Sequence, residues 1–277
     1  MASLLRDKSY LVTGSTDGIG RHTAEKLYRA GAHVMVHGRN AARVKETVDF
    51  LTSNGNGTVS SFVADLSDLT QVRRLATEVK ETLKWEGKQL TCLINNAGVY
   101  ENQKVISSSG LELTWAVNVA APFLLTSLLL AQNSIKERIV NVASVSASSS
   151  IDFDNLQQEK GYSAHNAYSL SKLADIMFSN ELAERLAKSG APITSNSLDP
   201  GTVNTKMLYA GWGPIGMRVQ DANDQFFLAT DGSVSQVSGG YFISSRENRA
   251  PSPAYDVDAR RRLWDILEEQ TGAQWNI

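Results

Sequence analysis

The sequence has very little cysteine, and this limits the chemistry that the chain can perform. Cys92 is the single cysteine among 277 residues, so no disulfide can form within the chain, which suits a reducing compartment. It lies in the apolar run 90–94, where a buried strand residue is favoured over a catalytic thiol. We assign no metal site to the chain, and we expect it to be cytoplasmic.

The sequence also lacks an excess of charge of either sign. Lysine and arginine number 27 against 29 aspartates and glutamates, which gives a net charge of -2. We therefore expect no attraction to nucleic acid or to an anionic membrane surface. The densest basic run, Arg260–Arg262, lies in an amphipathic helical pattern, and we interpret it as a solvated face rather than a binding patch.

Long apolar runs are scarce as well. The longest, Val117–Ala131, is interrupted by polar residues and by Pro122, so we interpret it as too short and too polar to span a bilayer. The N-terminus leads almost at once into the run 10–14, which leaves no room for a secretion signal. We expect no membrane span.

What the sequence does contain is an alternation of short β-rich runs with helical patterns. With 42% hydrophobic residues, the chain can bury one large core. Several of the β-rich runs are apolar on both faces, which is typical of parallel strands covered by helices. The runs are Tyr10–Thr13, His33–Val36, Val59–Ala64, Leu90–Asn95, Arg138–Ala143, Thr194–Leu198 and Gly240–Ile243. We predict an α/β fold: a single domain over residues 1–277 with a doubly wound parallel sheet of about seven strands flanked by helices.

A glycine-rich turn follows the first of these strands. Residues 13–20 read TGSTDGIG, and a helical pattern from about Arg21 to Arg29 follows. Glycine permits a tight turn, close approach of the backbone to a diphosphate, and close packing of helix on strand. The N–H groups at the helix N-terminus then face the phosphates. The turn predicts a dinucleotide site formed by Gly14, Ser15, Thr16, Asp17, Gly18, Ile19 and Gly20.

The second predicted strand bears on which dinucleotide binds. NAD enzymes usually place a carboxylate about twenty residues beyond the glycines, where it accepts from the ribose 2′-hydroxyl. Here no carboxylate lies between Glu25 and Glu46, and Arg39 follows the strand. A guanidinium can instead bind a 2′-phosphate with two hydrogen bonds. An ordinary surface arginine is the alternative, but the missing carboxylate favours NADP(H) over NAD(H).

A tyrosine and a lysine four residues apart form the candidate catalytic pair. Tyr168 and Lys172 share one face of a helix predicted from about His165 to Lys188. Reducing a carbonyl by hydride transfer requires a proton, and a free phenol with a pKa of about 10 exchanges protons poorly at neutral pH. A nearby ammonium lowers that pKa toward the working range. Ser144 follows the fifth strand at the ligand-binding edge of the sheet, where its hydroxyl can orient the substrate oxygen.

Taken together, these motifs resemble the short-chain dehydrogenase/reductase superfamily, which has a Rossmann-type fold. The glycine spacing and the Tyr-x-x-x-Lys pair match, and so do the Asn-Asn-Ala-Gly turn at 95–98 and the Pro-Gly-x-x-x-Thr turn at 200–205. The resemblance implies that Asn118 is a fourth catalytic residue that supports a proton-relaying water through Lys172. It also implies cofactor contacts from Asp65, Leu66, Asn95, Ala97, Gly98, Tyr168, Lys172, Pro200, Gly201, Val203 and Thr205.

A narrower resemblance, to the retinol dehydrogenase and WW-domain oxidoreductase branch, rests on an insertion and on the C-terminal tail. Ser144 and Tyr168 are 24 residues apart, about twice the separation usual in the superfamily, because of a stretch that begins at Ile151. This branch implies apolar aldehydes or ketones as substrates. The segment from Lys206 to Asp221, where the family has its substrate lid, is short and rich in glycine. We expect it to be a mobile substrate loop, with a plain surface turn as the alternative.

The leading hypothesis is therefore an NADP(H)-dependent oxidoreductase that interconverts a carbonyl and an alcohol, with Tyr168 as the general acid or base. Its partner is a small-molecule carbonyl or alcohol substrate, and the sequence leaves both a homodimer and a monomer open. The alternative is a catalytically silent NADP(H)-binding regulator or scaffold of the same fold. Binding of NADPH without turnover on any carbonyl would favour that alternative.

Overall fold

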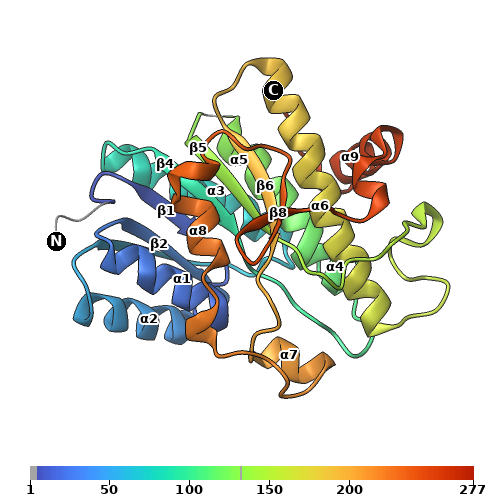
Figure 1. Cartoon of the computed structure of the whole chain (residues 1–277), viewed down its shortest axis with the longest axis horizontal. Coiled ribbons are helices and arrows are strands. Elements are labelled where there is room, and N and C mark those ends of the chain that lie inside the picture. The colour runs from blue at the N-terminus through green and yellow to red at the C-terminus, as the bar shows by residue number, and fades with distance from the viewer. Residues whose placement is uncertain (1–4, 132) are drawn as a thin grey trace.

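The computed structural model describes residues 5–131 and 133–277, and its centre is an eight-stranded sheet (Figure 1). The strand order is β3-β2-β1-β4-β5-β6-β7-β8, with β1 to β7 parallel. The strands are β1 (Ser9–Val12), β2 (His33–Gly38), β3 (Thr58–Val63), β4 (Leu90–Asn95), β5 (Ile135–Val142), β6 (Thr194–Asp199), β7 (Tyr241–Ile243) and β8 (Arg246–Asn248). The predicted doubly wound α/β fold is confirmed, and each of the seven predicted strands is present.

The eighth strand is the difference from the prediction. β8 pairs antiparallel with β7 after a tight turn through Ser244 and Ser245, whose φ angles are positive at 50° and 57°. Its three residues are polar and exposed at the edge of the sheet. A strand without apolar residues has no period-2 hydrophobic pattern, so the sequence contained no signal for it.

Helices cover both faces of the sheet. On one face lie α1 (Gly18–Arg29), α2 (Ala41–Ser53) and α8 (Asp224–Thr230); on the other lie α3 (Leu69–Trp85), α5 (Ala121–Leu130) and α6 (Ala164–Ser189) (Figure 1). The helix α9 (Val257–Thr271) packs outside α5 and α6. Two short helices, α4 (Leu113–Trp115) and α7 (Lys206–Gly211), and the π-helical turn η1 (Ala116–Ala120) complete the elements near the site. Each face therefore buries its own apolar cluster, as a two-sided parallel sheet requires.

The apolar segment before β5 is longer than predicted. Within the described residues, Leu113–Leu130 is a continuous helical stretch with a mean hydropathy of 1.7, long and apolar enough by composition to cross a membrane. The interpretation that the segment is too short and too polar was therefore wrong on length and composition. In the fold, 83% of this stretch is buried. The C-terminal part of the chain covers it, with the rings of Trp264 and Trp275 each 4.9 Å from the ring of Phe123.

The basic run in α9 is only partly a solvated face. Arg260 is 8% exposed, and its guanidinium donates to Glu184 at 2.6 Å and to the carbonyl oxygen of Ala254 at 3.1 Å. The interpretation was wrong for this residue, because a buried guanidinium must be paired and α6 supplies the carboxylates. Arg261 and Arg262 do extend toward solvent, with more than half of each side chain exposed.

The sheet order determines where a ligand can bind. The chain runs from β1 outward to β2 and β3 and then returns to β4 on the other side of β1. A crevice forms at the carboxyl ends of the strands where the order reverses. The turns that follow β1, β2, β3 and β4 contain Gly14, Arg39, Asp65 and Asn96, so all four lie along that edge.

Candidate active site

The glycine-rich turn is packed tightly against the turn that follows β4. Gly14 has a positive φ of 65°, and a Cβ added there would lie 2.9 Å from the Cα of Ala97. A Cβ on Gly20 would lie 2.3 Å from the amide nitrogen of Asn96, which itself donates to the Thr13 carbonyl oxygen at 2.7 Å. Only glycine fits at both positions, so the two turns form one rigid wall.

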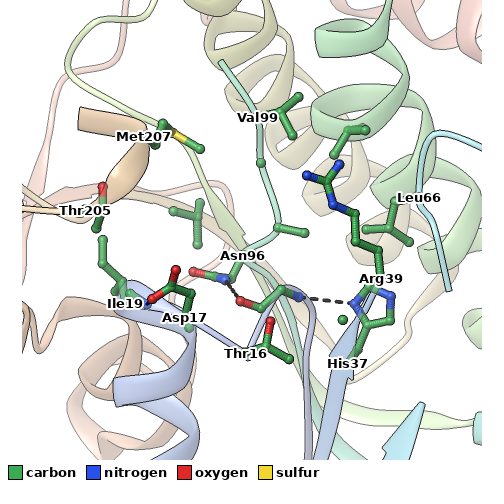
Figure 2. Close-up of a pocket in the computed structure, with 18 of the residues that line it drawn as sticks. Thr16, Asp17, Ile19, His37, Arg39, Leu66, Asn96, Val99, Thr205 and Met207 are labelled. Carbon is green, nitrogen blue, oxygen red and sulfur yellow. Dashed lines mark hydrogen bonds between the residues drawn. The ribbon is translucent and has the colours of Figure 1, made fainter. Parts of the chain in front are cut away.

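A cavity of about 290 Å³ lies along this wall and reaches the candidate catalytic pair. In Figure 2, Arg39 and Leu66 lie at one end, Thr205 and Met207 lie at the other, and the glycine turn runs between them. Fifteen of the residues predicted for the site line the cavity. They are Gly14, Thr16, Asp17, Gly18, Ile19, Gly20, Arg39, Asp65, Leu66, Ala97, Gly98, Tyr168, Lys172, Pro200 and Thr205.

Six predicted residues lie outside the lining of the cavity. Ser15 is fully buried, and its N–H donates to the His37 carbonyl oxygen at 2.9 Å. The amide of Asn95 donates to Asn141 at 2.9 Å within the core. The other four residues outside the lining are Asn118, Ser144, Gly201 and Val203.

Asn118 links the turn after β4 to helix α6. Its Oδ1 accepts from the Val99 N–H at 2.8 Å, and its Nδ2 donates to the Val99 carbonyl oxygen at 3.1 Å and to Ser171 Oγ at 2.9 Å. It lies in the π-helical turn η1, which explains why an asparagine with poor helix propensity occurs within an otherwise apolar helical stretch. Its role in a water relay stays a prediction.

The candidate catalytic residues come together as the spacing predicts. The ammonium of Lys172 lies 5.7 Å from the ring centroid of Tyr168, and both side chains are buried. Ser144 lies within hydrogen-bonding reach of the Tyr168 phenol and acts to lower the pKa of that phenol. A phenol and an ammonium therefore lie together at one end of the cavity, with the Ser144 hydroxyl beside them.

The direction of the Tyr168 pKa differs from the expectation. Burial of the phenol raises its pKa, and although Lys172 and the Ser144 hydrogen bond act to lower it, the pKa stays above its ordinary value. The ammonium has the predicted effect, but the cost of burying a phenolate outweighs it. Tyr168 is therefore protonated at neutral pH in this structure.

The opposite end of the cavity is basic. Arg39 is exposed and lines it, and so does Arg43, which was not predicted. Arg43 pairs with Asp17 at 2.7 Å, and Lys206 pairs with the same carboxylate at 2.9 Å. Partial burial would raise the pKa of Asp17, but the hydrogen bonds from Lys206 and Arg43 outweigh it and lower that pKa. These cations compensate for a carboxylate in a turn predicted to bind phosphates.

His37 is a supporting residue that the sequence analysis missed. Its Nδ1 accepts from the Gly14 N–H at 3.2 Å, and its Nε2 donates to the Ala64 carbonyl oxygen at 3.1 Å. Burial lowers its pKa to about 4, so the ring is neutral and can accept. A histidine near the end of the buried strand β2 was the available signal. Ten other unpredicted residues also line the cavity: Gly38, Arg43, Ala64, Asn96, Val99, Val117, Val142, Ala143, Lys206 and Met207.

The buried neutral His37 leads to a prediction for stability. Between the unfolded pKa of 6.5 and the folded value of about 4, the unfolded chain binds more protons, so lowering the pH destabilises the parent. His37→Gln removes this proton uptake. The difference in unfolding free energy between parent and variant should shrink by about 2 kcal/mol from about pH 7 to about pH 5, measured by urea denaturation. His33, present in both proteins, cancels, and a difference that stays constant with pH would contradict the prediction.

The segment 206–221 lies over the candidate catalytic tyrosine. The Trp212 ring is 5.5 Å from the ring of Tyr168 and 5.1 Å from that of Tyr100. Backbone hydrogen bonds hold the base of the segment 206–221. The N–H of Asn204 donates to the carbonyl oxygen of Met217 at 2.9 Å, and the N–H of Met217 donates to that of Thr202 at 2.8 Å. The segment thus has a fixed base and an aromatic tip, and its mobility stays a prediction.

These features define the chain as a short-chain dehydrogenase, an oxidoreductase family to which it belongs: the family profile, described as short chain dehydrogenase, matches residues 8–211. Within the family it lies in the retinol dehydrogenase-like branch. It is 34% identical to retinol dehydrogenase 14 of Homo sapiens over 297 aligned residues, which cover 97% of this chain and 88% of the relative.

Solved structures show the same architecture. An uncharacterised protein from Mycobacterium paratuberculosis superposes with a TM-score of 0.82 at 25% identity, over 100% of this chain and 99% of its own. The landomycin C-6 ketoreductase LanV, solved with bound NADP and rabelomycin, superposes with a TM-score of 0.67 at 26% identity. That match covers 85% of this chain and 94% of the ketoreductase.

Proposed function

We propose that the protein is an NADP(H)-dependent oxidoreductase that interconverts an apolar aldehyde or ketone and its alcohol, with Tyr168 as the general acid or base. One observation carries the proposal. The phenol of Tyr168 lies beside the Lys172 ammonium and within hydrogen-bonding reach of Ser144, in a cavity continuous with the glycine turn.

The residues along the cavity fit a dinucleotide phosphate. The backbone at Gly14 and Gly20 leaves no room for a side chain, and the N-terminus of α1 opens onto the same wall. That wall would hold the diphosphate. Arg39 and Arg43 offer two guanidiniums for a 2′-phosphate. A bound nicotinamide would supply or accept the hydride. The NADP bound to the ketoreductase LanV supports the same cofactor class for this chain.

Side chains of this protein would transfer the proton. In the direction of reduction, Ser144 orients the substrate oxygen by a hydrogen bond, and Tyr168, which is protonated at neutral pH, donates its proton to that oxygen. Lys172 then stabilises the phenolate that forms. In the direction of oxidation the same groups act in reverse. The protonated state of Tyr168 in this structure suits the direction of reduction.

The apolar substrate class is supported by the surroundings of Tyr168. Met207, Val99 and Val117 line the cavity, and Trp212 packs against the tyrosine ring. These side chains offer apolar surface and few polar groups, which favours a carbonyl attached to an apolar group. The retinol dehydrogenases named among the relatives support the same class.

The proposal is tested by turnover of the purified chain. We expect NADPH to be oxidised in the presence of some member of a panel of aldehydes, ketones and retinoids, with apolar members giving the highest kcat/KM. NADH should be a poorer reductant. If NADPH binds but no member of the panel is reduced and no alcohol is oxidised, the proposal fails and the regulatory alternative is favoured.

The segment over Tyr168 gives a further prediction. Shortening the loop Tyr209–Pro214, or the point change Trp212→Ala, removes the aromatic tip that packs on Tyr168. We expect the ratio of kcat/KM for a bulky apolar carbonyl to that for a small aldehyde to change severalfold, since a hydrophobic contact of this size contributes roughly 1–3 kcal/mol to discrimination. Trp85→Ala, at an exposed tryptophan in α3, is the matched control. An unchanged substrate profile would count against the assignment of this loop.

A further inference from the structure

A buried carboxylate lies next to the candidate catalytic lysine, and the reaction described above gives it no role. Asp175 is one helical turn beyond Lys172 on α6, and the distance from its Oδ2 to the lysine Nζ is 2.9 Å. Both side chains are almost fully buried, at 6% and 5% exposed. Burying a charge pair is costly, so a pair at this position calls for an explanation beyond stability.

The first part of the explanation is the number of donors on the lysine. An ammonium has three N–H groups. One of those on Lys172 is donated to the carbonyl oxygen of Val142 at 2.7 Å, and a second is donated to Asp175. Lys172 also lines the cavity. Two fixed partners therefore leave one N–H for the cavity and determine where it points.

The second part is charge. The ionisable groups around Tyr168 are Lys172 and Asp175 on α6, Asp199 at the end of β6, Tyr241 on β7, and Tyr100 after β4, whose ring centroid is 5.6 Å from that of Tyr168. Lys172 lowers the pKa of Tyr168, whereas Asp175 and Asp199 raise it. The Asp199 carboxylate is also engaged by the N–H groups of Val145 and Gly201. Asp175 has only Lys172 as a hydrogen-bonding partner among the contacts found in the described residues.

We propose that Asp175 is a positioning residue. Its carboxylate holds the Lys172 ammonium so that a single N–H is presented to the cavity, and its negative charge offsets part of the effect of that ammonium on Tyr168. Asp175 thereby sets the pH at which Tyr168 exchanges its proton. The inference rests on the proposed function, because it concerns the same phenol.

The state of Asp175 is consistent with this role. Burial raises its pKa to about 6, although Lys172 acts to lower it, so the carboxylate is ionised at neutral pH and pairs with the ammonium. The pKa of Lys172 is raised because Asp175 and Tyr168 outweigh its burial, so the lysine stays charged. The pair is therefore an ion pair under the conditions in which Tyr168 would act.

Asp175→Asn is the direct test, because it keeps the size and one acceptor oxygen but removes the charge. Loss of a negative charge stabilises the phenolate, so the pKa of Tyr168 should fall. We expect the acid limb of kcat/KM for alcohol oxidation, which requires the phenolate, to move to lower pH by about one unit. The maximum rate should change little, since Lys172 keeps its hydrogen bond.

A second readout does not depend on turnover. The near-ultraviolet absorbance of tyrosinate, measured against pH with the Tyr168→Phe variant as the reference, isolates the titration of this one phenol. The Asp175→Asn protein should titrate at lower pH than the parent. Asp175→Ser, which also removes the charge but leaves space for water, should shift the titration in the same direction and gives the answer if the asparagine variant does not fold.

Asp175→Leu removes the acceptor as well as the charge, so the lysine loses a partner that holds it. We expect the Kd for NADPH, measured by fluorescence without substrate, to rise by roughly tenfold, as loss of a charged hydrogen bond does. Asp175→Asn should raise it far less. A raised Kd in the Asp175→Leu protein alone would show that the hydrogen bond from Lys172 to Asp175 holds the lysine in place. A shifted pH profile in the Asp175→Asn protein would show that the charge of Asp175 sets the pKa of Tyr168.

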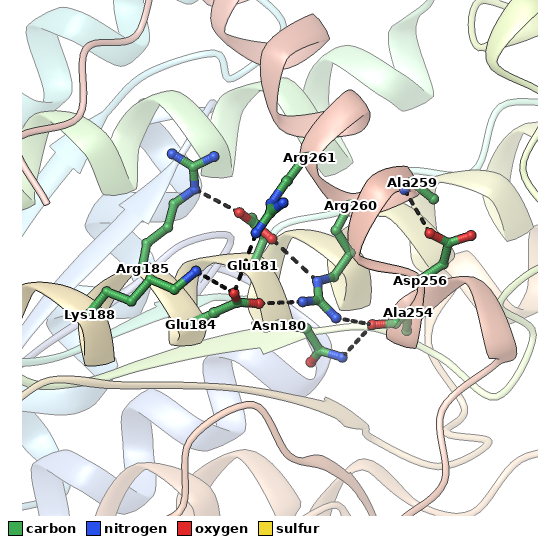
Figure 3. Close-up of polar contacts among 10 residues, drawn as sticks. All are labelled: Asn180, Glu181, Glu184, Arg185, Lys188, Ala254, Asp256, Ala259, Arg260 and Arg261. Carbon is green, nitrogen blue, oxygen red and sulfur yellow. Dashed lines mark hydrogen bonds and ion pairs between the residues drawn. The ribbon is translucent and has the colours of Figure 1, made fainter.

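The matched control is Glu181→Gln on the same helix. Glu181 is also buried and also paired with cations, Arg185 at 2.9 Å and Arg260 at 3.3 Å (Figure 3). This change should lower stability but leave the pH profile and the phenol titration unmoved. Profiles of the Asp175→Asn and Asp175→Ser proteins that superpose on the parent profile would overturn the inference. If the parent shows no turnover on any carbonyl, the proposed function fails, and the absorbance titration still decides the role of Asp175.

Discussion

Tyr168→Phe is expected to reduce turnover by about a thousandfold, the contribution typical of a general acid or base, while the Kd for NADPH changes by less than about twofold. The change removes one hydroxyl and leaves the ring that packs against Tyr100 and Trp212. The cavity should therefore keep its shape and lose only the proton donor. Steady-state kinetics with the best carbonyl of the panel and fluorescence titration of NADPH measure the two effects.

Tyr162→Phe is the matched control for that experiment. Tyr162 lies six residues earlier, and its hydroxyl donates to the Glu101 carbonyl oxygen. We assign it no part in proton transfer. The control should keep most of the parent activity. Substantial residual turnover in the Tyr168→Phe protein would remove Tyr168 from its assigned role and, with it, the proposed mechanism.

Arg39→Ala is expected to weaken NADPH binding by about 10- to 100-fold and to leave NADH binding nearly unchanged. The lost interaction would be a charge-assisted hydrogen bond to the 2′-phosphate, worth roughly 1.5–3 kcal/mol. NADH has a hydroxyl at that position and cannot make this bond. The Kd values of both nucleotides, measured at one fixed salt concentration, give the preference of parent and variant directly.

Arg43 is a second guanidinium that could preserve part of the preference for NADPH in the Arg39→Ala protein. It lines the same end of the cavity, but its guanidinium is already paired with Asp17 at 2.7 Å. We therefore expect Arg43→Ala to have the smaller effect and the double variant to lose the remaining preference. Lys45→Ala removes a positive charge from the same helix at a residue paired with Asp49, and it should change neither affinity. Equal affinities of the parent for NADPH and NADH would contradict the cofactor assignment.

The two effects separate the two halves of the site. Tyr168→Phe removes the group that transfers the proton, whereas Arg39→Ala removes a group that would bind the cofactor. Figure 2 shows Arg39 at the far end of the cavity from Thr205 and Met207. The Tyr168→Phe protein should therefore still distinguish NADPH from NADH. The Arg39→Ala protein should regain its rate at saturating cofactor, because none of the groups around the phenol is altered.

The sequence predicted most accurately those features that depend on residues close together along the chain. The seven parallel strands, the glycine turn and the Tyr168–Lys172 pair follow from patterns within a few residues of one another, and the structure has the predicted strands, turn and spacing. The predicted helix from about His165 to Lys188 is α6, Ala164–Ser189. The strand β8 could not be predicted in this way, because three exposed polar residues carry no periodic signal.

Contacts between distant segments could not be predicted. His37 supports Gly14 from another strand, and Lys206 reaches Asp17 from a helix near residue 206. A polar residue in a buried strand was the only hint of the first, and the second had none. Arg260 illustrates the same limit, because its amphipathic pattern indicated solvent and only the packing of α9 on α6 placed carboxylates around it.

By itself the sequence determined the type of fold, the glycine turn of the candidate cofactor site and the identity of the candidate acid and base, since backbone conformation and helical spacing are local properties. The tertiary structure decided which side chains surround them and how far each is removed from water. Burial reversed the expected direction of the Tyr168 pKa and placed Asp175 against Lys172. Electrostatic energies depend on the distance between charges and on their exclusion from solvent, and both are set only when the chain is packed.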